Sequence, residues 1–489
     1  MGVDFAYVRA WVLPVFAGSG VWLALHARRR VGGDIAAALG AGWLIGVFVA
    51  STIARFVAAD DTAHAFAAAW PWLIGIGVIA WVAAYFRLRG SETWLARTSP
   101  IVVARPTRAM WMGAALLLIA IVVRLIVIGD EASLRPVFPW DAWSAWAIKP
   151  KTWFLLGHAD PYVPMIEWLS NPVAATRTAA AGSYPELLAW LQLWFASATG
   201  AWNEPLVNVA WCGALSAFAL AAYGYWRSFG LSMPLALALV YALVSLPLID
   251  AHIALAGYAD IWIAVTLGLA VSMWTRWLIL RERGQWLLAI AVAVCLPAIK
   301  NEGAVWLLAF AAVVVLDLVP MRWRWRLIAA AAVLLVIGLL VGGFDLPIPG
   351  LGVVHVGRGK AEIPGVAVFE LAWHGVGGAV IASLFTLPNW HLLWYAFPLL
   401  LIVRRRRFRD DPVARLVGLL LLIDFAFLFV LFFFTPASAW ARDYTSANRL
   451  MLQVVPSVFV LAAVLLRPLA VSAEERSRAR GWRSPSVPA

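Results

Sequence analysis

Long apolar runs alternate with short polar or basic segments along the whole chain. Runs such as "MGAALLLIAIVVRLIVIG" and "VARLVGLLLLIDFAFLFVLFFF" are long enough to cross a bilayer as helices, which takes about 20 apolar residues each. The runs between polar segments predict about 13 transmembrane helices. They leave no room for a large soluble domain. The pattern therefore predicts an all-α, polytopic membrane protein.

Composition agrees with this class, since 63% of the residues are hydrophobic and 13% are charged. The net charge of +12 would favour nucleic-acid binding in a soluble protein. Here the basic residues fall in short clusters between apolar runs, which is the pattern of membrane topology, and no nucleic-acid partner is expected. The two cysteines and the histidines show no metal-ligand spacing, so no zinc site is proposed.

The basic clusters predict the orientation of the chain. They include "MRWRWR" at 321–326, "RRRRFR" at 404–409 and the tail at 468–489. Because cytoplasmic loops carry an excess of Lys and Arg, these segments are expected inside. The N-terminus is then outside and the C-terminus inside. The two largest outer segments are 130–204 and 344–389, and loops of this length usually carry function or structure of their own.

The first large outer segment contains an unusual mixture of rings and charges, "FPWDAWSAWAIKPKTWFLLG" at 138–157. Its tryptophans predict a helix at the boundary of water and lipid, with Asp141 near its start. Lys149 and Lys151 are expected to snorkel to headgroups. The stretch "GSYPELLAWLQLWFASATG" at 182–200 predicts a second interfacial helix. Among the tryptophans, an interfacial belt is favoured over a wall that stacks on a sugar ring.

Further ionisable groups are expected on the same side. The motif "YADIW" begins at Tyr258 and contains Asp260, and Arg442 and Arg449 precede the last apolar run. The motif "KNEG" begins at Lys300 between two runs that are short for full spans, which predicts two short helices meeting at an outer turn. A charge at membrane depth costs about 2.5–3.5 kcal/mol and normally faces a cavity or a partner.

This ordered set of features resembles the GT-C glycosyltransferases, membrane enzymes that move a sugar from a polyprenyl-phosphate carrier to an acceptor. The protein O-mannosyltransferase and aminoarabinose transferase branches are the nearest in pattern. The shared features are an Asp after a span, two helices in the first outer loop, "YPELL", "YADIW", "KNEG" and an Arg before the last span. Asp141 departs from the acidic pair of several relatives, and "KNEG" departs from their frequent "TKG".

The resemblance implies an organisation and a location. Residues 110–467 would form the catalytic transmembrane region, with 1–109 as an N-terminal addition of three spans and 468–489 as a basic cytoplasmic tail. The protein would lie in the cytoplasmic membrane of a bacterium with its site facing outward. Its partners would be a polyprenyl-phosphate-linked sugar, a lipid, glycan or protein acceptor, and membrane lipids.

The chemistry needs a carboxylate that takes a proton from the acceptor and cations that hold the phosphate as it gains charge. Asp141 is the candidate base, and Lys300, Arg449 and Arg442 are the candidate phosphate ligands. Asp260 is a candidate for binding the acceptor or a metal. No cofactor is assigned, although a divalent cation, Mg²⁺ or Mn²⁺, stays open. The candidate substrate-loop residues are Tyr184, Glu186, Tyr258, Glu302 and Trp143.

Each of these residues also has a structural interpretation. Asp141 and Asp260 are good helix caps. Lys300 has Glu302 nearby, but residues two apart do not face each other on a helix, and a turn or cavity role is favoured. Arg449 has no obvious local partner and enters the last apolar run, so it is preferred to Arg442.

Two other classes of function are open. A secondary transporter or lipid flippase would show internal repeats and charges near the middle of broken helices. No repeat is visible, and only Arg124, Asp424 and the "KNEG" turn interrupt the apolar runs. The third possibility is a non-catalytic scaffold in the assembly of an envelope polymer.

The predicted topology can be tested by thiol labelling. Single cysteines near Asp141, Asp260 and Arg442 should react with an impermeant reagent added outside, because those positions are expected in outer segments. Cysteines at 404–409 should not react. Labelling of both sets from the same side would contradict the architecture.

Overall fold

The computed structural model describes residues 5–26, 31–89, 107–171, 175–348, 352–357, 359–363 and 367–468. Within these ranges the chain is predominantly helical. Much of the basic segments 26–30 and 87–108, and nearly all of the tail 468–489, lie outside the described residues. The predicted division into 1–109, 110–467 and the tail stays a prediction.

Eight helices in the described part of the chain are long and apolar enough to span a membrane. They are α1 (Phe5–Leu25), α2 (Asp34–Val57), η1 with α3 (Thr62–Leu88), α5 (Arg108–Leu134), α9 (Glu204–Ser228), α12 (Asp260–Leu280), α20 (Pro412–Phe434) and α22 (Ser446–Leu466). The pair α10 (Met233–Val244) and α11 (Pro247–Ala254), bent by 61°, makes a ninth if it counts as one broken span. The protein is thus a multi-pass membrane protein by helix length and hydropathy.

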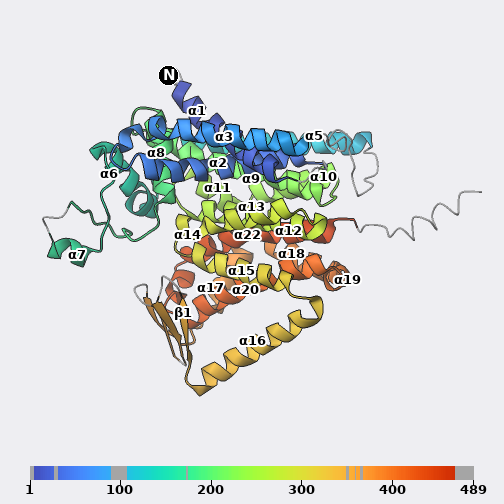
Figure 1. Ribbon diagram of the computed structural model, residues 1–489. Helices are drawn as coiled ribbons and strands as arrows, with labels where there is room; N and C mark the ends of the chain where they lie inside the picture. Colours follow the sequence, from blue (N-terminus) through green and yellow to red (C-terminus); the bar gives the residue numbers. More distant parts are fainter. Residues whose placement is uncertain are drawn as a thin grey trace, which may run out of the picture.

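The predicted count of about 13 spans is not shown. Several apolar runs form shorter helices instead, among the described residues. These are α13 (Arg283–Val294) with α14 (Leu296–Ile299), α15 (Gly303–Leu318) and α18 (Leu393–Val403). The sequence count included each such run as a membrane-crossing helix, although the two runs beside "KNEG" were expected to form short helices. Helix α16 (Met321–Val341) runs diagonally away from the other helices (Figure 1).

The core of the bundle is formed by α12 and α22. In their most apolar stretches, 83% and 89% of the residues are buried, against 17% for α5. The two helices approach closely at Gly268, where an added Cβ would lie 2.5 Å from the Cβ of Pro456. Small residues permit such contacts, which stabilise helix pairs in membranes by van der Waals packing.

The first large outer segment folds into η2 (Ala142–Ala147), α6 (Ile148–Leu156), α7 (Met165–Ser170) and α8 (Leu187–Ala198). The predicted helix at 182–200 is present in part as α8, but the predicted interfacial position was wrong. It is almost entirely buried by protein rather than lying exposed at an interface. Trp194 in α8 donates a hydrogen bond to the carbonyl of Ala10 in α1, and Ser197 accepts one from the backbone of Phe66 in α3.

The second large outer segment contains an antiparallel sheet that the all-helical prediction did not include. Its strands are β1 (Phe344–Ile348), β2 (Gly352–Val356), β3 (Lys360–Ile363) and β4 (Ala367–Glu370), in the order β1-β2-β3-β4. Residues Asp345 and His355 face each other across β1 and β2. The chain continues through α17 (Gly377–Ile381) and η3 (Ala382–Thr386), and the two remaining helices are α19 (Arg405–Asp410) and α21 (Ser438–Arg442).

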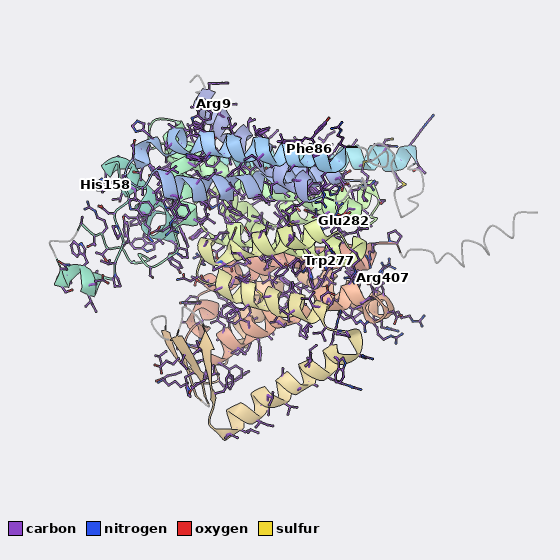
Figure 2. The ribbon with its side chains drawn as sticks, viewed as in Figure 1. Arg9, Phe86, His158, Trp277, Glu282 and Arg407 are labelled. Atoms are coloured by element: carbon purple, nitrogen blue, oxygen red, sulfur yellow. The ribbon has the colours of Figure 1, made fainter. Side chains whose placement is uncertain are left out.

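The two ends of the bundle differ in content. Figure 1 shows the sheet and α6–α8 toward the left and α19 toward the right. In Figure 2, His158 lies at the left end, whereas Glu282 and Arg407 lie toward the right. The basic segment 404–409 is thus remote from the first large outer segment, as the predicted topology requires. The structure does not contain a membrane, and the orientation stays a prediction.

A buried ionic cluster, the Arg276 cluster, ties the first helices to the core. Arg276 Nη1 lies 2.6 Å from Asp34 Oδ1, and its Nε lies 2.8 Å from Glu282 Oε2. His26 Nε2 lies 3.2 Å from Asp34 Oδ2, and its ring stacks on Trp22. All of these residues are buried. Sequence reasoning missed the cluster, because Arg276 and Asp34 are 242 residues apart.

Replacing Arg276 by Met should destabilise the fold. The change leaves the Asp34 and Glu282 carboxylates buried without their cation, which typically costs about 3–5 kcal/mol. Thermal unfolding in detergent measures the loss. Arg281→Met is the matched control, because Arg281 is exposed and its contact to Asp317 should contribute at most about 1 kcal/mol. Equal stability of the two variants would contradict this role of Arg276.

Candidate functional site

Four residues from separate segments meet in one ionic cluster, here called the Asp260 cluster: Asp141, Asp260, Lys300 and Arg449. Asp260 is fully buried at the start of α12 and lies at the centre. Lys300 Nζ donates to Asp260 Oδ1 at 2.9 Å. Arg449 donates to Asp260 Oδ2 from Nε at 3.0 Å, and its Nη2 lies 2.9 Å from the same oxygen. The structure therefore brings these four predicted site residues together.

A glutamine that the sequence analysis missed completes the shell of Asp260. Gln453 Nε2 donates to Asp260 Oδ1 at 2.6 Å, and Trp306 Nε1 in α15 donates to Gln453 Oε1 at 2.6 Å. The Trp306 bond fixes the orientation of the amide. Gln453 follows Arg449 by one helical turn, so both side chains lie on one face of α22. A polar residue one turn from Arg449 within an apolar run was the available signal.

Asp141 is the accessible carboxylate of the cluster. Arg449 Nη1 donates to Asp141 Oδ2 at 2.5 Å, and the Asp141 side chain is 44% exposed. Its side chain makes no capping hydrogen bond to the helix that follows. Asp260 likewise directs its side chain to the cluster. Ion pairs with Arg449 therefore account for the positions of these two side chains better than helix capping does.

Lys300 has partners on both sides. Besides Asp260, its Nζ lies 3.1 Å from Glu302 Oε1. Residues two apart do not face each other on a helix, but Lys300 has extended backbone between α14 and α15, so the pair with Glu302 forms beside the predicted turn. The predicted break between two short helices is confirmed at this point. Lys300 and Arg449 also share a partner that is distant from both in the sequence, because each donates to Asp260.

An aromatic ring covers the guanidinium of Arg449. The Arg449 Cζ lies 4.2 Å from the centroid of the Tyr258 ring, a cation–π geometry. The Tyr258 carbonyl accepts a hydrogen bond from Trp211 Nε1 at 2.7 Å, which fixes the loop before α12. Burial raises the pKa of the Tyr258 phenol above its usual value. Tyr258 is thus a neutral wall of the cluster.

The two lysines of the first large outer segment donate hydrogen bonds to protein groups. Lys149 is buried, and its Nζ donates to the carbonyl of Tyr184 at 2.7 Å. Burial lowers the pKa of Lys149. The prediction that Lys149 snorkels to lipid was wrong, because α6 packs its lysine face on the segment before α8. Lys151 is about half exposed and bonds Glu204 Oε1 at 2.7 Å.

The remaining predicted residues are distributed unevenly. Burial raises the pKa of the Tyr184 phenol, and the neighbouring Glu302 carboxylate adds to this effect. Glu186 lies 3.4 Å from Arg55 and serves as its partner. Arg442 is exposed at the end of α21, and none of the described contacts join it to the Asp260 cluster. Arg442 is therefore not brought into the site.

The tryptophans beside Asp141 do not form one wall. Trp140 and Trp143 are 71% and 43% exposed and meet edge to face at 4.8 Å. Trp146 and Trp153 are buried, with Trp146 packed on the Tyr184 ring. Only the first pair is open to a ligand or to lipid.

The charges of the site are nearly balanced before any substrate binds. Asp141, Asp260 and Glu302 supply three negative charges, while Lys300 and Arg449 supply two positive ones. A phosphate that binds Lys300 or Arg449 competes with the carboxylates that already contact these cations. Asp141 is the half-exposed partner, so its contact is the easiest to exchange. No group of three or more His, Cys, Asp or Glu side chains suited to a metal occurs in the described ranges.

An apolar groove of about 430 Å³ lies between α10, α18 and α22. Its lining includes Leu239, Tyr241, Phe397, Phe459 and Ala462. One end contains Trp390, whose Nε1 donates to Asn448 Oδ1 at 3.4 Å. Since Asn448 directly precedes Arg449, this end of the groove reaches the turn of α22 that carries Arg449.

A scan against protein-family models found no match, and searches of curated proteins and of solved structures found none either. The interpretation of the site therefore rests on its residues and their geometry.

The two aspartates of the cluster should differ in their effect on stability. Asp260→Asn leaves a buried lysine and arginine without their shared carboxylate, and we expect a loss of about 3–5 kcal/mol. Asp141→Asn removes the half-exposed member of a pair and should cost at most about 1 kcal/mol. Thermal unfolding of both purified variants measures the difference. An Asp260→Asn variant as stable as the Asp141→Asn variant would show that Asp260 does not hold the cluster together.

Proposed function

We propose that this protein transfers a sugar from a polyprenyl-phosphate carrier to an acceptor at the Asp260 cluster. The observation that carries the proposal is the convergence of Asp141, Asp260, Lys300 and Arg449, which are distant in sequence. These are the residues that the ordered motifs singled out before their positions were known.

Asp141 acts as the base in this proposal. Its Oδ2 is held by Arg449, and none of the contacts among the described residues involves Oδ1, which would accept the proton of an acceptor hydroxyl. The acceptor oxygen then bonds to the anomeric carbon of the sugar. The bond between that carbon and the phosphate oxygen breaks, and the electron pair leaves with the carrier phosphate. The exposure of Asp141 suits a group that must meet the acceptor.

Arg449 and Lys300 receive the leaving phosphate. The guanidinium offers a planar fork to phosphate oxygens, and the lysine adds a point charge. Arg449 Nη1 carries two N–H groups, so it can donate to a phosphate oxygen and to Asp141 while Nε and Nη2 stay on Asp260. We assign Asp260 a positioning role, because it is fully buried and its oxygens already accept from three side chains. A fixed cation stabilises developing charge without reorganisation.

The apolar groove between α10, α18 and α22 suits the hydrocarbon chain of the carrier. It ends beside Asn448, so a phosphate at Arg449 and a chain in the groove are compatible. The basic segment 404–409 favours placing the opposite end of the bundle inside the cell. The Asp260 cluster then faces outward from the cytoplasmic membrane of a bacterium, and the acceptor is a lipid, glycan or protein on that side.

A transporter or flippase is the second candidate, and the bent pair α10–α11 favours it. Broken helices commonly line transport sites. Asp250 in α11 pairs with Arg124 in α5, with Arg124 Nε donating to Oδ1 at 3.1 Å. This ion pair fixes α11 to α5, whereas the Asp260 cluster contains an accessible carboxylate, Asp141.

Asp141→Asn tests the proposed reaction directly. The amide keeps the size of the side chain but loses its basicity, so sugar transfer should fall by about 10²-fold or more. Transfer from a polyprenyl-phosphate sugar is measured in liposomes, with folding checked by thermal unfolding. Asp130→Asn serves as the matched control, because Asp130 is an exposed carboxylate near the end of α5.

Wild-type transfer by a folded Asp141→Asn variant would remove Asp141 from the reaction. A wild-type protein that moves the carrier lipid across the bilayer without forming a glycosylated product would favour the flippase. Absence of both activities in the presence of varied carriers and acceptors would favour the scaffold.

A further inference from the structure

A second polar cavity, here called the basic cavity, lies at the opposite end of the bundle from the Asp260 cluster. Its volume is about 550 Å³, and it is formed by the end of α18, by α19, by the start of α20 and by the residue after α22. Its lining residues are Val403, Arg404, Arg406, Arg407, Asp410, Asp411, Pro412 and Arg467. Arg467 directly follows α22 and is 18 residues beyond Arg449, which corresponds to about 27 Å along the helix axis. The basic cavity is therefore separate from the proposed site of sugar transfer.

The lining has an excess of positive charge. Four arginines face two aspartates, which leaves two positive charges over. Asp411 is already occupied, because its Oδ2 accepts from Arg467 Nη2 at 2.8 Å and its Oδ1 caps α20 through the backbone of Val413. Asp410 is paired with Arg409, at 3.0 Å, outside the lining. The acids of the cavity do not neutralise its arginines.

Arg407 is the lining residue whose guanidinium has unpaired N–H groups among the described residues. Its side chain is 11% exposed. Among the described residues, its Nε and Nη2 have no hydrogen-bond partner, and the nearest carboxylate oxygen, on Asp411, is 3.9 Å from Nη2. Burial lowers the pKa of Arg407, with a further contribution from Arg467. A charged donor in this position is costly unless an acceptor supplies the missing hydrogen bonds.

We propose that the basic cavity binds the phosphate group of an anionic phospholipid, with Arg407 as its central ligand. A guanidinium with two free N–H groups matches the geometry of phosphate oxygens. The apolar side chains of Leu399, Ile402 and Val403 are exposed on α18 next to the cavity and provide a surface for acyl chains. Basic pockets between membrane helices recognise anionic headgroups in this way.

Lipid binding to the full-length protein in a neutral detergent tests the inference. A short-chain phosphatidylglycerol, a phosphatidylcholine of the same chain length and inorganic phosphate are titrated separately, and thermal unfolding and native mass spectrometry follow binding. We expect saturable binding of phosphatidylglycerol, weaker binding of phosphatidylcholine, and no effect of inorganic phosphate at the same concentration. Arg407→Gln should raise the dissociation constant for phosphatidylglycerol about tenfold.

Two further variants make the result specific. The double variant Arg404→Gln, Arg406→Gln changes exposed lining residues, and it should weaken binding even if Arg407→Gln folds poorly. Arg405→Gln is the matched control, because Arg405 lies on the same helix but outside the lining. The dissociation constant of this variant for phosphatidylglycerol should stay within about twofold of the wild-type value. Equal weakening by Arg405→Gln would reduce the effect to general surface charge and overturn the site. Binding of inorganic phosphate as tight as that of the lipid would overturn the lipid assignment.

Discussion

The buried carboxylate of Asp260 determines the arrangement of the candidate site. It lies at the start of the most enclosed part of the bundle, where water cannot solvate its charge. Burying a charge without partners is costly, so cations must reach it. Lys300 reaches it because α14 ends at an extended residue, and Arg449 reaches it because α22 packs along α12. The extended residue between α14 and α15 and the first turn of α22 therefore meet at Asp260.

Helix α12 carries both buried ionic clusters. Asp260 lies at its first residue, and Arg276 lies in its final third. Through Asp260 the helix is bound to α22, and through Arg276 it is bound to α2. The acid at the N-terminal end and the base toward the C-terminal end also suit the helix dipole. A helix held at both ends gives the cations of the Asp260 cluster fixed positions, and the proposed binding of phosphate depends on such positions.

The chain separates fixed charges from accessible ones. At the Asp260 cluster the cations are paired and mostly enclosed, while the side chain of Asp141 is almost half exposed. In the basic cavity the opposite holds, since the acids are occupied and Arg407 keeps donors unpaired. The first arrangement suits proton acceptance near held cations, and the second suits anion binding. Both follow from which partner each buried charge already has.

The class of the protein follows from its sequence alone, because apolar runs of membrane length can be stable only as helices in lipid. The sequence also indicated the break at Lys300 and the residues Asp141, Asp260 and Arg449, since ionisable groups are rare and costly in such a chain. It could not determine the number of full spans, because run length alone does not say where a helix ends. The packing of the folded chain, by contrast, places α8 beneath the first helices, bonds Lys149 to protein and leaves Arg442 apart from the cluster. Those outcomes depend on contacts between residues far apart in sequence, such as the pair of Arg276 and Asp34, and no local pattern records which distant partner a buried charge will meet.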